Sequence, residues 1–175
     1  MSWKKNDQGS LFFWLAKHRQ TDASELAGGA EKLIIWLNGG PGCSSMIGMM
    51  HENGPFTIEF ADSNTSVVND PSAPKFKLKN NPYSWNRAAN VLYVEQPVRT
   101  GYSMAAKGKG PTTDEQMLAV DFRHFILSFL EVFPQYKGIP YSIAVSSAGR
   151  AKTLFFYFCV ESLFLPFCPV CILFV

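Results

Sequence analysis

Four apolar runs along the chain predict strands that are buried in one sheet. They cover Leu11–Ala16, Lys32–Leu37, Asn90–Glu95 and Tyr141–Val145. We expect the first two to be neighbouring strands, joined by a polar, glycine-bearing loop from Arg19 to Ala30. The third run is apolar enough to be buried on both faces, which is typical of a strand inside a parallel sheet.

A longer apolar period predicts a helix between the last two strands. The segment Thr113–Gln116 has the spacing of a capping box, and Pro134 ends the pattern. The apolar residues between them recur at three- and four-residue steps, as on one broad helix face: Leu118, Phe122, Phe125, Ile126, Phe129, Leu130 and Phe133. We interpret this stripe as core rather than as a cofactor site. The segment Phe60–Lys79, with clustered Asn, Ser, Asp and Pro, predicts a loop instead.

The most specific stretch directly follows the second predicted strand. It runs from Trp36 to Ser45 as Trp-Leu-Asn-Gly-Gly-Pro-Gly-Cys-Ser-Ser. Glycines leave the backbone with little side-chain cover, so its N–H groups can approach a ligand closely. Such N–H groups at the end of a strand form oxyanion holes and carboxylate clamps. A single glycine-rich turn would be weak support for such a site, but the whole decamer is far more specific.

Composition narrows the class of protein without adding a site. The chain has 175 residues, 47% hydrophobic and 14% aromatic, which is enough for one domain with a core. The net charge is only +2 and no basic stripe interleaves with aromatic residues, so nucleic acid is not suggested as a partner. No cluster of metal ligands and no cofactor motif is apparent, so we expect neither a metal nor a cofactor.

The decamer resembles the first signature of the serine carboxypeptidases (peptidase family S10), which are α/β-hydrolase peptidases. Further blocks that resemble the family follow in its order, so the resemblance extends from about Gly9 to Arg150. They are Gly9–Leu15, Glu52–Phe56, Asn81–Asn86, Ala89–Val98, Thr100–Ser103, Asp114–Gln116 and Pro140–Arg150. The resemblance implies an incomplete α/β-hydrolase fold, with the N-terminal portion of the central mixed sheet and its flanking helices. We therefore divide the chain into residues 1–150, the N-terminal part of that domain, and an apolar tail of unclear origin, residues 151–175.

The resemblance also implies a site and a reaction. Ser146, within Ala144–Gly149, aligns with the family's nucleophile, and the order strand, helix, strand, tight turn is that of the α/β-hydrolases. The N–H groups of Ser147 and Gly40 would form the oxyanion hole. Asn38 and the Gly39 backbone would hold the terminal carboxylate of the substrate. The implied activity is the release of C-terminal residues from a peptide or protein with a free C-terminus, through an acyl-enzyme on Ser146.

Three residues depart from the family's pattern at these positions. Val145 replaces a glutamate that helps to hold the substrate carboxylate, so recognition of that carboxylate should weaken. Ser147 replaces a tyrosine that lines the substrate site, although its backbone N–H remains. Arg99 replaces a glycine, and two interpretations stay open: the arginine blocks a tightly packed position near the pocket, or it faces water and changes little.

The catalytic base is a further departure. In this fold the order along the chain is Ser, then Asp, then His. Residues 147–175 contain neither Asp nor His, and the histidines at 18, 51 and 124 all precede Ser146, although His51 follows the glycine-rich loop closely enough to lie near the site. Without a positioned base a serine hydroxyl is a weak nucleophile, so we expect this chain by itself to be inactive or nearly so. The alternative is a non-catalytic homologue that binds peptides or partner proteins.

The tail from Thr153 to Val175 is rich in Phe, Leu, Cys, Val and Pro, and nothing in it resembles the family. Glu161 and two prolines interrupt the run of about 20 apolar residues that a membrane span needs. A composition dominated by Phe, Leu, Cys, Val and Pro is what results when pyrimidine-rich DNA is translated. We therefore interpret the tail as intron read-through or a frameshift, in preference to a membrane anchor.

The resemblance implies the secretory pathway, with a vacuolar, lysosomal or extracellular destination. The segment Met1–Asn6 shows no apolar signal-peptide core, which fits a missing N-terminal piece as well as a cytosolic protein. In the family a distant cysteine pairs with the one at Cys43, but its partner is not recognisable here. Asn64 begins a glycosylation sequon, which is meaningful only in a secreted protein. A sheet that lacks its downstream strands predicts poor solubility for the isolated chain.

Overall fold

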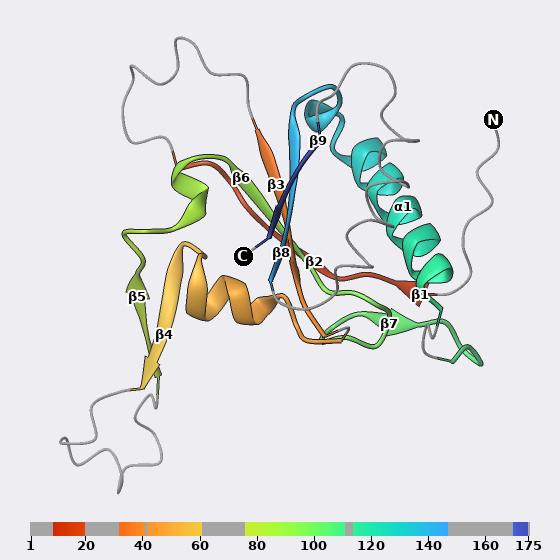
Figure 1. Ribbon diagram of the computed structural model, residues 1–175. Helices are drawn as coiled ribbons and strands as arrows, with labels where there is room; N and C mark the ends of the chain where they lie inside the picture. The colour runs from red at the N-terminus through yellow and green to blue at the C-terminus, as the bar shows by residue number, and fades with distance from the viewer. Residues whose placement is uncertain are drawn as a thin grey trace, which may run out of the picture.

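A mixed sheet organises the chain in the computed structural model, which describes residues 9–19, 32–40, 42–60, 76–110, 114–146 and 170–174. The described strands of this sheet lie in the order β2 (Phe13–Ala16), β6 (Asn90–Val94), β3 (Leu33–Asn38), β8 (Tyr141–Ser146) and β9 (Val170–Phe174) (Figure 1). Strand β2 is antiparallel to β6, whereas the other neighbouring pairs are parallel. All four predicted strands are therefore confirmed.

The predicted adjacency of the first two strands is wrong, because β6 lies between β2 and β3. The burial of the strands gives the physical reason. Every residue of β6 is buried, so this strand needs a neighbour on each edge and cover on each face. Strand β2 has an exposed Trp14 and only one buried residue, Ala16, which suits the outer position.

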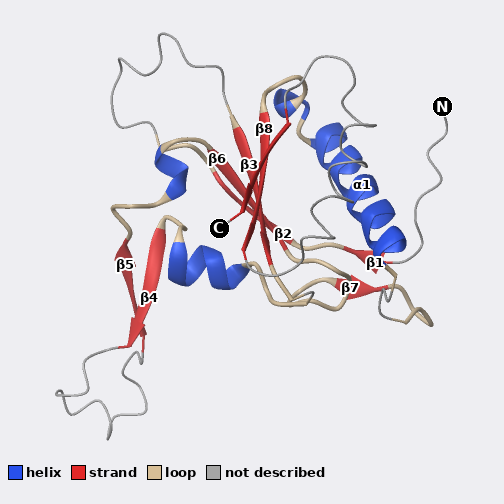
Figure 2. Cartoon of the chain, viewed as in Figure 1, coloured by secondary structure: helices blue, strands red, loops and turns tan. Residues whose placement is uncertain are grey.

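Helix α1 (Glu115–Val132) covers one face of the sheet (Figure 2). The predicted apolar stripe is confirmed, since its residues lie in the core between α1 and the sheet or pack against it. The sheet contributes Leu33, Ile35, Leu37, Leu92, Val94, Tyr141 and Ile143 to this core. The helix ends at Val132, and a 3-10 turn, η5 (Pro134–Tyr136), follows, as Pro134 predicts. Thr113 of the predicted capping box lies outside the described residues.

The opposite face of the sheet is covered by short helical turns. These are η2 (Gly48–Glu52), a single π-helical turn, and η4 (Trp85–Arg87), a 3-10 turn. Met46 and Met49 pack there against Trp36, Val91 and Tyr93 of the sheet. The Trp36 and Trp85 rings meet edge to face, with centroids 5.2 Å apart.

An antiparallel hairpin projects from the sheet and corrects the predicted loop at 60–79. Strand β4 (Phe56–Phe60) pairs with β5 (Phe76–Asn80), from Phe56 opposite Asn80 to Phe60 opposite Phe76. In β5, two apolar residues alternate with two lysines, a strand pattern too short to stand out from the polar residues before it. Residues 61–75 between the strands, with Asn64, lie outside the described residues.

Two smaller features complete the architecture. Strand β1 (Gly9–Ser10) pairs with β7 (Met104–Ala105) in a short antiparallel ribbon. In the apolar tail, residues 170–174 form β9, which pairs with β8 from Tyr141 opposite Val170 to Val145 opposite Phe174. Residues 151–169 lie outside the described residues. Among the residues that the structure describes, no helix is both long enough and apolar enough to span a membrane.

Candidate functional site

Strands β3 and β8 end side by side, and their last residues are Asn38 and Ser146. The two strands are parallel neighbours, and Asn38 lies directly opposite Ser146 in the register. The carboxyl ends of parallel strands form one edge of a sheet, where ligand sites of α/β folds occur. Gly39 and Gly40 follow Asn38 directly, so the structure gathers four of the five predicted site residues at this edge. The fifth, Ser147, lies outside the described residues.

Asn38 and Ser146 lie on the face of the sheet that points away from α1. Side chains alternate between faces along a strand, and the preceding residues, Leu37 and Val145, belong to or pack against the core beside α1. Ser146 is half-buried. Its side chain therefore lies on the face that carries η2.

The amide group of Asn38 has a defined orientation. Trp36 Nε1 donates to Asn38 Oδ1 at 2.6 Å. Because the indole N–H can only donate, the amide oxygen must face it and the Asn38 NH₂ group points the other way. The backbone N–H of Asn38 donates to Ser45 Oγ at 3.1 Å. Asn38 therefore presents a fixed pair of side-chain donors at the end of β3.

The glycine-rich loop (Gly39, Gly40, Gly42 and Cys43) is a tight turn that accepts only glycine at its centre. The N–H of Cys43 donates to Gly39 O at 3.3 Å and closes the turn. Gly40 has a φ of 118°, and a Cβ there would lie 3.0 Å from the Gly42 nitrogen and 3.2 Å from that of Cys43. A side chain at Gly40 would thus be both strained and crowded. Cys43 has a free and exposed thiol.

Two serines and a buried glutamate hold this loop against β6, although the sequence did not predict a role for them. Ser45 Oγ donates to Val94 O at 2.5 Å, while Ser44 Oγ donates to Glu95 Oε1. Glu95 has no exposed surface, and its Oε2 accepts from the N–H of Tyr102. A charged residue directly after the largely apolar residues 91–94 was the signal in the sequence that could have identified Glu95.

The structure decides between the two interpretations of Arg99. Its side chain is exposed, and Nη2 donates to Lys109 O at 3.0 Å. Arg99 therefore faces water and does not fill a pocket. Its φ is +74°, a left-handed conformation that glycine adopts without strain, which accounts for the glycine that the family has here.

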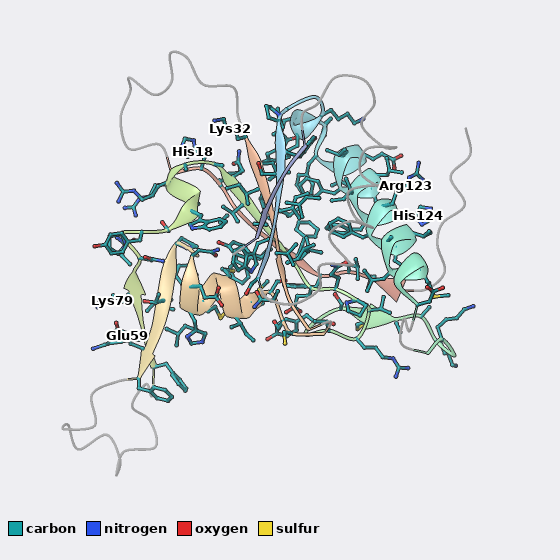
Figure 3. The ribbon with its side chains drawn as sticks, viewed as in Figure 1. His18, Lys32, Glu59, Lys79, Arg123 and His124 are labelled. Carbon is teal, nitrogen blue, oxygen red and sulfur yellow. The ribbon has the colours of Figure 1, made fainter. Side chains whose placement is uncertain are left out.

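Val145 and the histidines complete the list of positions that bear on catalysis. Val145 packs against the apolar core beside α1, so its side chain lies on the opposite face from Asn38. His18 lies at the amino ends of β3 and β6, where its backbone N–H donates to Asn90 Oδ1. Figure 3 shows His124 on α1, on the side of the molecule opposite His18. His51 is exposed at the end of η2. Among the described residues, no histidine is hydrogen-bonded to Ser146.

Below the site, Tyr93 is fully buried and donates from its hydroxyl to Asn53 Oδ1 at 3.1 Å. Burial raises the pKa of the Tyr93 phenol well above its usual value of 10.0, and the negative charge of Glu52 raises the pKa further. The phenol is therefore a neutral hydrogen-bond donor throughout the physiological range.

Within the described part of the chain, no group of three or more His, Cys, Asp or Glu side chains is arranged to hold a metal ion.

Comparisons with known proteins agree with this architecture. The family model "Serine carboxypeptidase" matches residues 1–158. Serine carboxypeptidase-like 21 of Arabidopsis thaliana is 36% identical over 124 residues, which cover 71% of this chain and 23% of that protein. The pheromone-processing carboxypeptidase KEX1 of Phytophthora infestans is 38% identical over 151 residues, which cover 83% of this chain and 22% of that protein.

A solved structure shows the fold. The crystal structure of a prohormone-processing carboxypeptidase from Saccharomyces cerevisiae matches with a TM-score of 0.60 and 22% identity, over 95% of this chain and 38% of that one. The predicted α/β-hydrolase fold is confirmed by this likeness, with the N-terminal portion of the central sheet present here. The chain spans about a quarter of the length of the curated relatives that it matches.

Proposed function

Because the chain belongs to the serine carboxypeptidase family, we propose that it carries the nucleophile and the substrate clamp of a serine-type carboxypeptidase. The observation that supports this function most strongly is the register of β3 and β8, which sets Asn38 opposite Ser146 beside the glycine-rich loop. The substrate would be a peptide or protein with a free C-terminus.

In this proposal the Ser146 hydroxyl attacks the carbonyl carbon of the last peptide bond. The developing oxyanion accepts hydrogen bonds from the N–H groups of Gly40 and Ser147, because backbone donors held in advance stabilise charge that develops in the transition state. The NH₂ group of Asn38, which Trp36 directs away from itself, and the Gly39 N–H hold the terminal carboxylate. The C–N bond then breaks, and the C-terminal residue leaves as an amine that takes up the proton which a base has accepted from Ser146. Water then hydrolyses the acyl ester and restores the Ser146 hydroxyl.

The proton of Ser146 must go to a base, and residues 147–175 contain neither Asp nor His. Loss of the base from a triad removes most of the rate and leaves only what the oxyanion hole and binding supply. We therefore expect the 175-residue chain on its own to lack peptidase activity. Hydrolysis requires a polypeptide that adds the Asp and the His.

A second function, peptide or partner binding without catalysis, has one observation in its favour. Val145 stands where the family has a carboxylate-binding glutamate, and its side chain packs against the core beside α1. The site then holds a peptide C-terminus only through Asn38 and the loop backbone. Such a protein would bind weakly and leave Ser146 unreactive.

Labelling with a fluorophosphonate probe separates the two functions. The protein should be expressed from its full transcript, with its C-terminus mapped by intact mass and peptide analysis. A carboxypeptidase reacts covalently at Ser146, and Ser146→Ala abolishes the labelling. The matched control is Ser142→Ala, a serine four places earlier on the same face of β8, which should label like the wild type. Well-folded wild-type protein that does not react supports the binding function.

We also propose that the protein follows the secretory route, as the resemblance implies. Asn64 begins a glycosylation sequon, so a secreted form should carry a glycan there. An endoglycosidase should shift its mobility on a gel, and Asn64→Gln should remove that shift. If endoglycosidase treatment left the gel mobility of the natural protein unchanged, the secretory assignment would be contradicted.

A further inference from the structure

We propose that Glu95 is a positioning residue that holds the glycine-rich loop in its oxyanion-binding conformation, acting through Ser44. The inference rests on the proposed function, because it names what orients the Gly40 donor. Glu95 lies directly after β6, and its side chain is fully buried. A buried carboxylate is costly unless it is hydrogen-bonded, so its partners indicate its task.

Both carboxylate oxygens of Glu95 accept from segments that converge on the site. Oε1 accepts from Ser44 Oγ, at the end of the glycine-rich loop, and Oε2 accepts from the N–H of Tyr102. The backbone of Glu95 is also held, since its oxygen accepts from Ser103 Oγ at 2.6 Å and its N–H donates to Phe12 O at 2.9 Å. Glu95 therefore cannot move without displacing three other segments.

Ser44 transmits this rigidity to the loop. Its hydroxyl oxygen accepts from the N–H of Met46 at 3.2 Å, so its proton is free to be donated to Glu95. The next residue back, Cys43, closes the turn onto Gly39. The next residue, Ser45, joins the start of the loop to β6, because its Oγ accepts from the Asn38 N–H and donates to Val94 O. Two adjacent serines thus fix the loop to the end of β6, and one of the two attachments depends on Glu95.

A carboxylate is the group that this position requires. It only accepts hydrogen bonds, and its two partners are both donors. Because the Tyr102 N–H can only donate, the NH₂ group of Glu95→Gln must face Ser44 Oγ. The bond to Ser44 is then reversed and is no longer made to a charged group, so the loop is held less firmly. A donor displaced by about 1 Å can cost about 100-fold in rate.

The test compares variants of the protein expressed from its full transcript. The rate constant for acylation by a saturating fluorophosphonate probe and the probe concentration that gives half-saturation are measured separately. Glu95→Gln and Ser44→Ala should each slow acylation by about 10-fold, with half-saturation within about twofold of wild type. The double variant should be no slower than either single variant, because one contact is removed in all three. Ser44→Thr, which keeps the hydroxyl, should restore most of the rate.

Glu59→Gln is the matched control, since Glu59 is a partly exposed glutamate on β4 that pairs with Lys79 at 3.0 Å. Figure 3 labels both residues on the hairpin. It should label like the wild type. If Glu95→Gln does not fold, the comparison of Ser44→Ala with Ser44→Thr decides. Wild-type rates in Glu95→Gln and Ser44→Ala, or losses that add in the double variant, would overturn the role of Glu95 and leave the proposed function intact. A wild-type protein that does not react would overturn both.

Discussion

The two faces of the central sheet are held by different kinds of interaction. On the face that α1 covers, the buried residues are almost entirely aliphatic and aromatic, and Phe129 meets Phe13, Phe125, Phe133 and Tyr136 in a continuous group of rings. On the other face and at the carboxyl edge, buried polar groups accompany the apolar ones: Ser45, Asn53, Glu95, Thr100 and Ser103. The packing of the first face depends on side-chain volume, whereas the structure of the second also depends on the direction of its hydrogen bonds.

This difference separates stability from geometry. Apolar packing is non-directional and tolerates changes of shape at constant volume, whereas a buried hydrogen-bonded group loses its contribution when one partner is replaced. Asn38 and Ser146, two of the residues proposed to act on a substrate, lie on the second face. We therefore expect substitutions beside α1 to change the free energy of unfolding, and substitutions at the carboxyl edge to change the shape of the site as well.

The largest effect on stability should come from the face beside α1. Phe122 is 1% exposed in the core between α1 and the sheet. Phe122→Ala should lower the free energy of unfolding by about 3–5 kcal/mol, because the lost ring leaves a cavity in a closely packed core. Urea denaturation measures the change. The control is Phe60→Ala on the hairpin, where the ring is 78% exposed, and its cost should stay below about 1 kcal/mol. Equal costs at the two positions would contradict the assignment of stability to the α1 face.

A backbone substitution should give the next largest effect, at the carboxyl edge. Gly101 has a φ of +51°, and a Cβ there would overlap the Glu95 carboxylate. Gly101→Ala should destabilise the protein by about 2–4 kcal/mol, through left-handed strain together with displacement of a buried group. Thermal unfolding measures the shift.

Gly108→Ala isolates the strain, since Gly108 has a φ of +79° and a Cβ there would meet nothing within 4 Å. Its cost should be about 1 kcal/mol. The difference between the two glycine variants is the part due to the Glu95 carboxylate. Equal costs would mean that this carboxylate adjusts freely, which would weaken the contrast between a rigid edge and the rest of the chain.

The same contrast governs what could be predicted of the fold. Strand β6 and helix α1 were predictable because each has a long, consistent apolar period. Strand β5 was not predictable, because only two apolar residues alternate with its lysines, and this short pattern adjoins a polar stretch. The order of β2, β6 and β3 was not predictable either, since periodicity describes a strand by itself and says nothing about its neighbours.

The residues of the site also fall into those that the sequence predicts and those that it does not. Asn38 and Ser146 were identified from sequence blocks, and the register of two parallel strands sets them opposite each other. The Ser44 and Glu95 side chains are 51 residues apart in sequence, and no local pattern joins them. A polar pair of this kind depends on where two loops meet in space. That meeting is decided by the packing of β3 against β6 and not by the loops themselves.

Tyr93 offers a test of the polar face through pH. Because its pKa is raised in the folded protein above the usual 10.0, the unfolded chain loses this proton first as the pH rises. The contribution to stability is fully present below pH 10 and is progressively lost as the pH rises above 10 toward the raised value. Tyr93→Phe should reduce this alkaline loss, measured as the difference in the free energy of unfolding between pH 9 and pH 11.

At neutral pH the same variant should cost about 1–2 kcal/mol, because Asn53 Oδ1 loses its buried donor. That cost is smaller than for Gly101→Ala, since the ring still fills its space. Wild-type behaviour between pH 9 and pH 11 in Tyr93→Phe would contradict the assignment of the alkaline loss to this phenol.

The smallest effect is expected at Arg99, where the carboxyl edge reaches solvent. Its left-handed φ of +74° costs about 1–2 kcal/mol in any residue with a Cβ, and glycine removes that strain. Glycine also gains freedom in the unfolded chain, worth about 0.4–1 kcal/mol, so Arg99→Gly should stabilise the protein by only about 0.5 kcal/mol. Arg99→Ala keeps the strain and loses the hydrogen bond to Lys109 O, so it should be neutral or slightly destabilising. Urea denaturation of the three proteins separates these contributions. If Arg99→Ala were as stable as Arg99→Gly, backbone strain would not explain the position, and the exposed guanidinium itself would be unfavourable there.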